Sequence, residues 1–361
     1  MRIVFNLGVF RRGGAERVIT NLSNGLADDN EVYIMITGIV DDPYVVNDKV
    51  KMLDLDEGGY LCNPIVRNAR RIRKMKKMLL AIQPDVVVSF LPSPSYRVLF
   101  LKKKINCKVI VSDRNDPRHE YKSLINRILC KWLYKRADGF VFQTNEQKNF
   151  FSKAIQEHSV VIPNPLKSEF LNSAVDERKK NTIISVGRFH KQKNQRLLID
   201  AFYEISLKYK NYKLKIFGHG PLEKELSDYI KRLGMVDKIM IHKPVEDIKK
   251  ELSESRIFVM TSDYEGMPNA LMEAMACGLP CISTDCPCGG PRELIKDGVN
   301  GILFGVGDKN QLIAKLEVLI EDDGLRKKLG REAKKICDKM NPEEICKRWK
   351  KYITEIVNGK N

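Results

Sequence analysis

Several features that mark common classes of protein are missing from this sequence of 361 residues. No apolar run approaches the roughly 20 residues of a membrane span, and the N-terminal segment lacks the small-residue cleavage site of a signal peptide. No internal repeat or low-complexity segment is present. The nine cysteines are irregularly spaced, and Cys286-Pro-Cys288 is not a zinc spacing. We therefore expect a globular cytosolic protein that keeps its cysteines reduced, as small core residues.

What the sequence has in excess is positive charge. The net charge is +17, and residues 1–165 carry 27 Lys and Arg against 17 Asp and Glu. A segment at 65–82 has apolar residues at helical spacing, surrounded by these cations: Arg67, Arg70, Arg71, Arg73, Lys74, Lys76 and Lys77. Such a surplus favours an anionic partner. We expect docking on an anionic membrane surface and not on nucleic acid, because no recognition motif and no cluster of aromatics for base stacking is present.

Strand and helix patterns alternate along the chain, which predicts parallel sheets with helical crossovers. Alternation stops at Pro163-Asn-Pro165 and restarts at Thr182. We expect an α/β protein with two Rossmann-like domains that face a cleft. The expected parts are an N-terminal domain (1–165), a linker (166–181), a second domain (182–340) and a final helical segment (341–361).

Glycine-rich turns follow the first strand of each half. Gly13 and Gly14 stand directly before a helix, with Arg11, Arg12 and Arg17 beside them. The spacing is not that of a dinucleotide site, and no acidic residue ends the second strand, so a nicotinamide cofactor is excluded. These glycines either serve strand–helix packing alone or allow an anion or a sugar to approach the backbone, which we favour.

In the second half the turns carry charge. Gly187 and Arg188 follow the strand 182–186, with Lys193 five residues on, and Gly218 follows the strand 213–217. Cations and glycines at the carboxyl ends of parallel strands favour a diphosphate site. The buried strand 257–260 leads to two carboxylates, Glu265 before a helix and Glu273 inside it. Pro268 is expected at the first helical position and Gly278 in the left-handed conformation after the last.

These motifs resemble those of the retaining GT-B glycosyltransferases of family four, relatives of glycogen and sucrose synthases. The matching segments are Gly187-Arg188 with Lys193-Asn194, Gly218-His-Gly220, the segment 265–280 with its glutamate pair, and the N-terminal segment 13–16. The segments 286–293 and 112–117 are similar to those of enzymes that extend capsule, exopolysaccharide or lipid-linked oligosaccharides.

The resemblance implies transfer of a hexose or N-acetylhexosamine from UDP-GalNAc, UDP-GlcNAc or UDP-Gal to a lipid-linked or polysaccharide acceptor. Arg188 and Lys193 would stabilise the leaving diphosphate, Glu265 would contact the sugar, and Glu273 would hold the ribose. The other implied donor contacts are Gly14, Gly187, Gly218, Val245, Gly266, Met267, Pro268 and Asn269, and the implied acceptor or sugar contacts are Gly13 and Arg114.

No cofactor and no metal is expected, because protein cations would neutralise the diphosphate; the Asp54-Leu-Asp56 string is interpreted as surface or loop charge. The enzyme would work in the cytoplasm, peripherally on the inner face of the plasma membrane, on a polyprenyl-diphosphate-linked saccharide. In this fold the chain's end commonly crosses back onto the first domain, with Trp349, Tyr352 and Ile356 as its apolar stripe.

The sequence departs from the family's pattern at one position, and two alternative functions stay open. Arg114 stands where many relatives carry a histidine, and His119, further on, is interpreted as a surface residue. Arginine cannot act as a base at neutral pH. The alternative functions are a nucleotide-sugar isomerase similar to UDP-GlcNAc 2-epimerases, and a non-catalytic nucleotide-sugar-binding protein.

Overall fold

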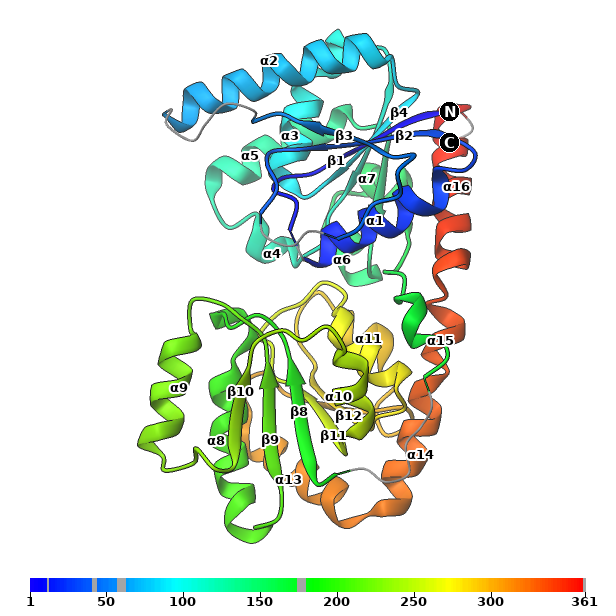
Figure 1. Cartoon of the computed structure of the whole chain (residues 1–361). Coiled ribbons are helices and arrows are strands. Elements are labelled where there is room, and N and C mark those ends of the chain that lie inside the picture. The colour runs from blue at the N-terminus through cyan, green and yellow to red at the C-terminus, as the bar shows by residue number, and fades with distance from the viewer. Residues whose placement is uncertain (12, 41–43, 57–62, 174–179, 360–361) are drawn as a thin grey trace. The chain divides into compact units, whose positions relative to one another are not determined.

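A computed structural model describes residues 1–11, 13–40, 44–56, 63–173 and 180–359. The chain forms two compact units (Figure 1): unit 1 is Met1–Pro165 with Pro342–Asn361, and unit 2 is Leu166–Asn341. Leu166 and Phe170, from the segment predicted as a linker, are fully buried in the core of unit 2. Arg12, Cys62 and residues 174–179 of the predicted linker lie outside the described residues.

Unit 1 is built on a parallel sheet of seven strands in the order β3-β2-β1-β4-β5-β6-β7. Sequential strands are added outward on both sides of β1 and β4, so the strand order reverses between these two. The strands are β1 (Arg2–Asn6), β2 (Glu31–Ile36), β3 (Lys51–Asp54), β4 (Val86–Phe90), β5 (Lys108–Ser112), β6 (Gly139–Phe142) and β7 (Ser159–Val161).

Helices cover both faces of this sheet. On one face α1 (Gly14–Leu26) packs beside α16 (Pro342–Val357); on the other lie α2 (Pro64–Ile82), α3 (Pro92–Leu101) and α5 (Leu124–Leu133). The shorter helices are α4 (Pro117–Glu120), α6 (Asn145–Asn149) and α7 (Lys153–Glu157). The chain's end is thus part of unit 1: Trp349, Tyr352 and Ile356 are buried in the core that α1 and β1 share.

The interpretation of Asp54-Leu-Asp56 as surface or loop charge holds only in part, because Asp56 lies in the loop after β3 but is largely buried. Asp54 ends β3, a strand that the sequence did not predict because it is an edge strand with mostly exposed side chains. Asp56 accepts a hydrogen bond of 2.9 Å from Nε of Arg71 on α2, and its side chain is only 12% exposed. The arginine holds the pKa of Asp56 below its ordinary value.

Unit 2 contains a second parallel sheet, of six strands in the order β10-β9-β8-β11-β12-β13. Its strands are β8 (Thr182–Val186), β9 (Lys213–Phe217), β10 (Ile239–His242), β11 (Ile257–Met260), β12 (Cys281–Thr284) and β13 (Ile302–Phe304). One face carries α8 (Gln195–Lys208), α9 (Glu223–Arg232) and α13 (Lys309–Glu321), and the other carries α10 (Ile248–Glu254), α11 (Asn269–Ala276) and α15 (Ile336–Lys339). α14 (Asp323–Lys334) contributes to both cores, through Leu329 and Ala333, and α12 (Gly290–Leu294) follows β12.

The predicted α/β class with two Rossmann-like parallel-sheet domains is confirmed. In both units the apolar residues of a strand alternate between two cores, one on each side of the sheet, as expected for strands buried on both faces. Within the described ranges, no helix has both the length and the apolar character needed to cross a membrane.

Candidate functional site

The loops that follow β8 and β11 are joined by hydrogen bonds at the carboxyl edge of the unit 2 sheet. The Asp263 N–H donates to the Gln192 carbonyl at 2.8 Å, and the Gln192 side-chain amide donates to the Tyr264 carbonyl at 2.8 Å. The Thr261 hydroxyl donates to the Lys193 carbonyl at 3.0 Å. Because β8 and β11 are adjacent in the sheet, these bonds fix the two loops side by side. Residues 72 positions apart in the sequence therefore meet.

Lys193 and Glu265 form an ion pair across these two loops, between Nζ and Oε1. Their side chains are 22% and 9% exposed, so the pair is largely withdrawn from water. The aliphatic stem of Lys193 runs over Gly187, where a Cβ atom would lie 3.5 Å from Lys193 Cδ. Burial and the Glu265 carboxylate raise the pKa of the neighbouring Cys286 thiol, which keeps it neutral. The sequence predicted both charged residues but not that they contact each other.

Arg188 occupies a different environment from Lys193. Its backbone carbonyl accepts a 2.9 Å hydrogen bond from Gln195, which fixes the main chain, while its side chain is exposed. The Arg188 guanidinium has no hydrogen-bond or ion-pair partner among the described residues. A rigid backbone with an unpaired planar cation is suited to bidentate contact with a phosphate.

Glycines allow the site loops to touch backbone to backbone. A Cβ atom on Gly218, after β9, would lie 2.0 Å from the Gly187 carbonyl oxygen. A Cβ atom on Gly290, at the start of α12, would lie 1.5 Å from the Gly266 carbonyl oxygen and 3.1 Å from Pro268 Cδ. The turns after β8 and β9, and those after β11 and β12, therefore interlock in pairs. The glycines at 289 and 290 were predicted to form a turn that allows close approach, but the sequence did not reveal that Gly290 faces the Gly266 backbone.

The carboxylate pair follows β11 and continues into α11. Glu265, Gly266 and Met267 are buried, and Glu273 is 5% exposed on a helix whose surroundings are mostly apolar. Glu273 is thus no helix-surface charge. Gly278 has φ of +67°, which confirms the predicted left-handed position after the helix. Pro268 is the N-cap and not the first helical residue; Asn269 takes that place.

Val245 is the predicted contact that lies farthest along the sheet edge. It follows β10, whose last residue, His242, accepts a 2.9 Å hydrogen bond from the Gly218 N–H through its carbonyl. The His242 ring stacks on Phe217 with centroids 4.7 Å apart, and burial lowers its pKa. Val245 itself is 41% exposed.

Gly13, Gly14 and Arg114 belong to unit 1. Gly13 is the N-cap of α1 and Gly14 its first residue. The Glu16 carboxylate folds back over them: a Cβ atom on Gly13 would lie 2.2 Å from Glu16 Oε2, and Arg11 Nε approaches Glu16 Oε1 at 3.7 Å. A carboxylate at this position favours sugar hydroxyls over an anion.

Arg114 is held firmly by its neighbours in unit 1. Its guanidinium lies over the ring of Phe90, 4.7 Å from the centroid, and over Trp349 at 5.3 Å. Nη1 donates to Asn164 Oδ1 at 3.0 Å, whereas the buried Nε and Nη2 have no partner among the described residues. Burial lowers the Arg114 pKa to about 9, so the side chain remains a cation at neutral pH.

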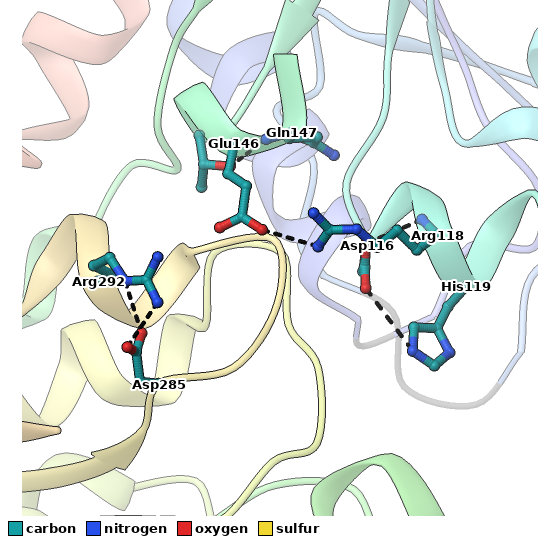
Figure 2. Close-up of polar contacts among 8 residues, drawn as sticks. Asp116, Arg118, His119, Glu146, Gln147, Asp285 and Arg292 are labelled. Carbon is teal, nitrogen blue, oxygen red and sulfur yellow. Dashed lines mark hydrogen bonds and ion pairs between the residues drawn. The ribbon is translucent and has the colours of Figure 1, made fainter. Parts of the chain in front are cut away.

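Figure 2 shows two further polar groups. His119 Nε2 lies 3.8 Å from Asp116 Oδ2, so this histidine, predicted as a plain surface residue, has a buried carboxylate as neighbour. The Arg292 guanidinium donates two hydrogen bonds to the Asp285 carboxylate, at 2.9 and 2.7 Å. This pair connects α12 to the residue that follows β12. No group of three or more His, Cys, Asp or Glu side chains with a metal-binding arrangement occurs in the part of the chain that the structure describes.

Next to Arg114, Asp113 is buried and accepts hydrogen bonds from Tyr121 at 2.7 Å and Tyr134 at 3.0 Å. Burial nevertheless raises its pKa to about 6, from 3.8. The fold therefore favours the protonated carboxyl. The stability that this preference gives is complete below pH 4 and is lost as the pH rises through 6.

We expect Asp113→Asn to stabilise unit 1 at pH 7 and to leave it nearly unchanged at pH 4, since asparagine never carries the costly buried charge. The difference in unfolding free energy at pH 7 should be about 3 kcal/mol. Thermal melting across pH 4–8 measures it. Asp48→Asn, at an exposed site, is the control and should keep the parent's pH dependence; a melting curve of Asp113→Asn that follows the parent at every pH would contradict the assignment.

Two family models match consecutive parts of the chain. "Glycosyltransferase Family 4" matches residues 12–170, and "Glycosyl transferases group 1" matches residues 167–336. The two matches meet where unit 1 passes into unit 2.

Curated relatives and solved structures agree with these matches. The chain is 27% identical, over 99% of its length and 100% of the relative's, to the GalNAc-alpha-(1->4)-GalNAc-alpha-(1->3)-diNAcBac-PP-undecaprenol alpha-1,4-N-acetyl-D-galactosaminyltransferase of Campylobacter jejuni. It is 29% identical to the amylovoran biosynthesis glycosyltransferase AmsD of Erwinia amylovora, over 95% of this chain and 96% of that one. The fold is similar to that of Anabaena HepE in complex with UDP (TM-score 0.80, 17% identity, 98% and 100% covered) and of sucrose-phosphate synthase from Thermosynechococcus elongatus (TM-score 0.87, 16% identity, 99% and 100% covered).

Proposed function

Since this chain belongs to the GT-B glycosyltransferases of family four and glycosyl transfer is therefore its reaction, we propose that it is a retaining hexosyltransferase. The donor is a UDP-sugar (UDP-GalNAc, UDP-GlcNAc or UDP-Gal), and the acceptor is a lipid-linked saccharide or polysaccharide at the membrane. One observation carries the proposal: a partly buried cation, Lys193, and a buried carboxylate, Glu265, meet at the carboxyl edge of a parallel sheet. These are the two charges that a diphosphate and a sugar require.

In the proposed reaction the bond between the anomeric carbon and the diphosphate breaks, and a bond to the acceptor oxygen forms on the same face. The departing phosphate oxygen takes the acceptor's proton, so no protein nucleophile is needed. Lys193 and Arg188 neutralise the charge that grows on the diphosphate. When the donor binds, its diphosphate replaces Glu265 as the ion-pair partner of Lys193. The released Glu265 carboxylate then accepts hydrogen bonds from the sugar hydroxyls.

The nucleotide lies farther along the same edge. Glu273 accepts the ribose hydroxyls, as a buried carboxylate can, and the base meets the backbone near Val245. The turns at Gly187 and Gly218 and the segment 266–269 provide backbone N–H groups and close approach. No metal is required, because Arg188 and Lys193 supply positive charge where other enzymes bind a cation.

The acceptor half of the proposal rests on unit 1. The relative from Campylobacter jejuni is named for an undecaprenol-diphosphate-linked acceptor, and we propose acceptors of that class here. Arg114, with two nitrogens lacking a partner among the described residues, provides donors for a phosphate or a sugar oxygen, and Gly13 and Gly14 provide close approach to the donor sugar. The protein would act in the cytoplasm as a peripheral protein of the inner membrane face, without nucleic acid.

The experiment is a screen of UDP-sugars with membrane extract as acceptor, read by UDP release in the presence of EDTA. We expect one donor to give UDP only when acceptor is present. Interconversion of the nucleotide sugar without acceptor would indicate an isomerase instead. Tight UDP binding with neither transfer nor hydrolysis across the panel would indicate a binding protein.

A further inference from the structure

One face of α5 exposes large apolar side chains to solvent. The face consists of Leu124 (70% exposed), Ile125 (70%), Ile128 (58%) and Trp132 (50%), called here the α5 apolar face. Their spacing along the sequence places all four on one continuous arc of the helix, about 100° wide. Four adjacent large apolar residues in water differ from the scattered single ones that any surface carries.

The opposite side of α5 is firmly anchored, so the exposure is not caused by a loose helix. Cys130 and Leu133 are buried in the core on this face of the unit 1 sheet. The Ser123 hydroxyl caps the helix by accepting from the Asn126 N–H at 3.1 Å. The Tyr96 hydroxyl on α3 donates to the Asn126 carbonyl at 3.1 Å. The α5 apolar face is therefore presented on a rigid support.

The sequence that carries this face is basic. The segment 122–136 contains five Lys and Arg and no Asp or Glu. Arg127 and Lys131 are exposed along one edge of the arc, and Lys122 and Lys135 are exposed at its two ends. The Arg136 guanidinium lies 4.1 Å from the centroid of the Trp132 ring, so this ring carries a cation on its face.

We propose that α5 inserts this apolar face into the interfacial region of an anionic lipid bilayer and anchors the enzyme there. A helix that lies in the membrane plane inserts its Leu and Ile side chains among the lipids and keeps an amphipathic Trp at the interface. Its Lys and Arg side chains contact the anionic headgroups. A helix of ten residues is far too short to span a bilayer. A second copy of this face would bring like charges together. The proposal deepens the proposed function, because it names the element by which the enzyme reaches a lipid-linked acceptor.

Tryptophan fluorescence tests the insertion directly. The sequence has two tryptophans, and Trp349 is fully buried, so a change on adding vesicles reports on Trp132. With vesicles of phosphatidylcholine and phosphatidylglycerol we expect a blue shift and quenching by brominated acyl chains, both lost in Trp132→Phe. Vesicle binding without any quenching would mean purely electrostatic docking and would overturn insertion.

Paired variants test the residues. We expect Leu124→Ser with Ile128→Ser to weaken vesicle binding at least roughly tenfold, because two inserted side chains lose their apolar burial. The melting temperature of this variant should equal that of the parent, since both replaced side chains are exposed. The control is Leu207→Ser with Val236→Ser, two residues of unit 2 that are 61% and 52% exposed, which should bind vesicles like the parent. Equal loss in both pairs, or no loss in either, would contradict the proposal.

Failure of the anchor and failure of the proposed function give different results. If the Leu124/Ile128 variant binds vesicles poorly but transfers normally to a water-soluble acceptor, both ideas stand. If the parent transfers to lipid-linked acceptor without binding vesicles, or if the variant only turns a dimer into a monomer in sedimentation, the anchor is wrong and the function stands. If the parent inserts but transfers no sugar, the anchor stands and the function is wrong.

Discussion

Replacement of Lys193 by alanine is expected to lower kcat/KM for sugar transfer by roughly 10³-fold, the effect typical of losing one preorganised charge at a developing anion. Two causes act together. The leaving diphosphate loses the cation that neutralises it, and the buried Glu265 keeps its charge without a partner. Initial rates of UDP release over a range of donor concentrations measure the effect.

Lys191→Ala is the matched control for that variant. Lys191 lies two residues away in the same short 3-10 helix, η4 (Lys191–Lys193), and is exposed. It has the same charge but no place in the site, so its removal should change kcat/KM by less than about threefold. Similar losses in both variants would mean that the general positive potential of the loop, and not the position of Lys193, supports the reaction.

Gly290→Ala is expected to damage the site through the backbone. The new Cβ atom would lie 1.5 Å from the Gly266 carbonyl oxygen, so the turn between Glu265 and Pro268 must move. We expect unit 2 to lose about 3 kcal/mol of stability, typical of a forced backbone shift in a packed region, and donor affinity to fall by roughly 100-fold. Chemical denaturation and donor titration measure the two effects.

Gly305→Ala serves as the comparison, because a Cβ atom there would meet nothing closer than Asp308 Cβ at 3.7 Å. Its stability should stay within about 0.5 kcal/mol of the parent. If Gly290→Ala binds donor as tightly as Gly305→Ala does, the interlocked turns do not hold the donor loop in place.

The sequence predicted most of what depends on local pattern. Apolar runs located buried strands such as β8 and β11, and glycines with charges marked the ends of β8 and β11, where a ligand site forms in a parallel sheet. β3 and β13 were missed for physical reasons. β3 is a partly exposed edge strand with charged residues at both ends, and β13 is apolar but only three residues long.

Contacts between distant segments were not predictable in the same way. That Lys193 pairs with Glu265, and that Gly290 touches Gly266, follows from the adjacency of β8 with β11 and of β11 with β12, which no local pattern encodes. The Asp56–Arg71 pair was not predicted for the same reason, since the burial of Asp56 depends on how α2 packs. The exposed side of α5 also needed the fold, because sequence periodicity does not say which apolar residues find a core.

The central claim is that two glutamates bind opposite ends of one UDP-sugar donor, Glu265 the sugar and Glu273 the ribose. Calorimetric titration of Glu265→Gln and Glu273→Gln with UDP and with the UDP-sugar from the screen tests it most directly. Glu273→Gln should weaken both ligands by the same factor, roughly tenfold or more. Glu265→Gln should weaken the UDP-sugar only and bind UDP at least as well as the parent, because Lys193 is then free for the diphosphate. Equal weakening of UDP by both substitutions, or a loss in Glu273→Gln confined to the UDP-sugar, would contradict the account.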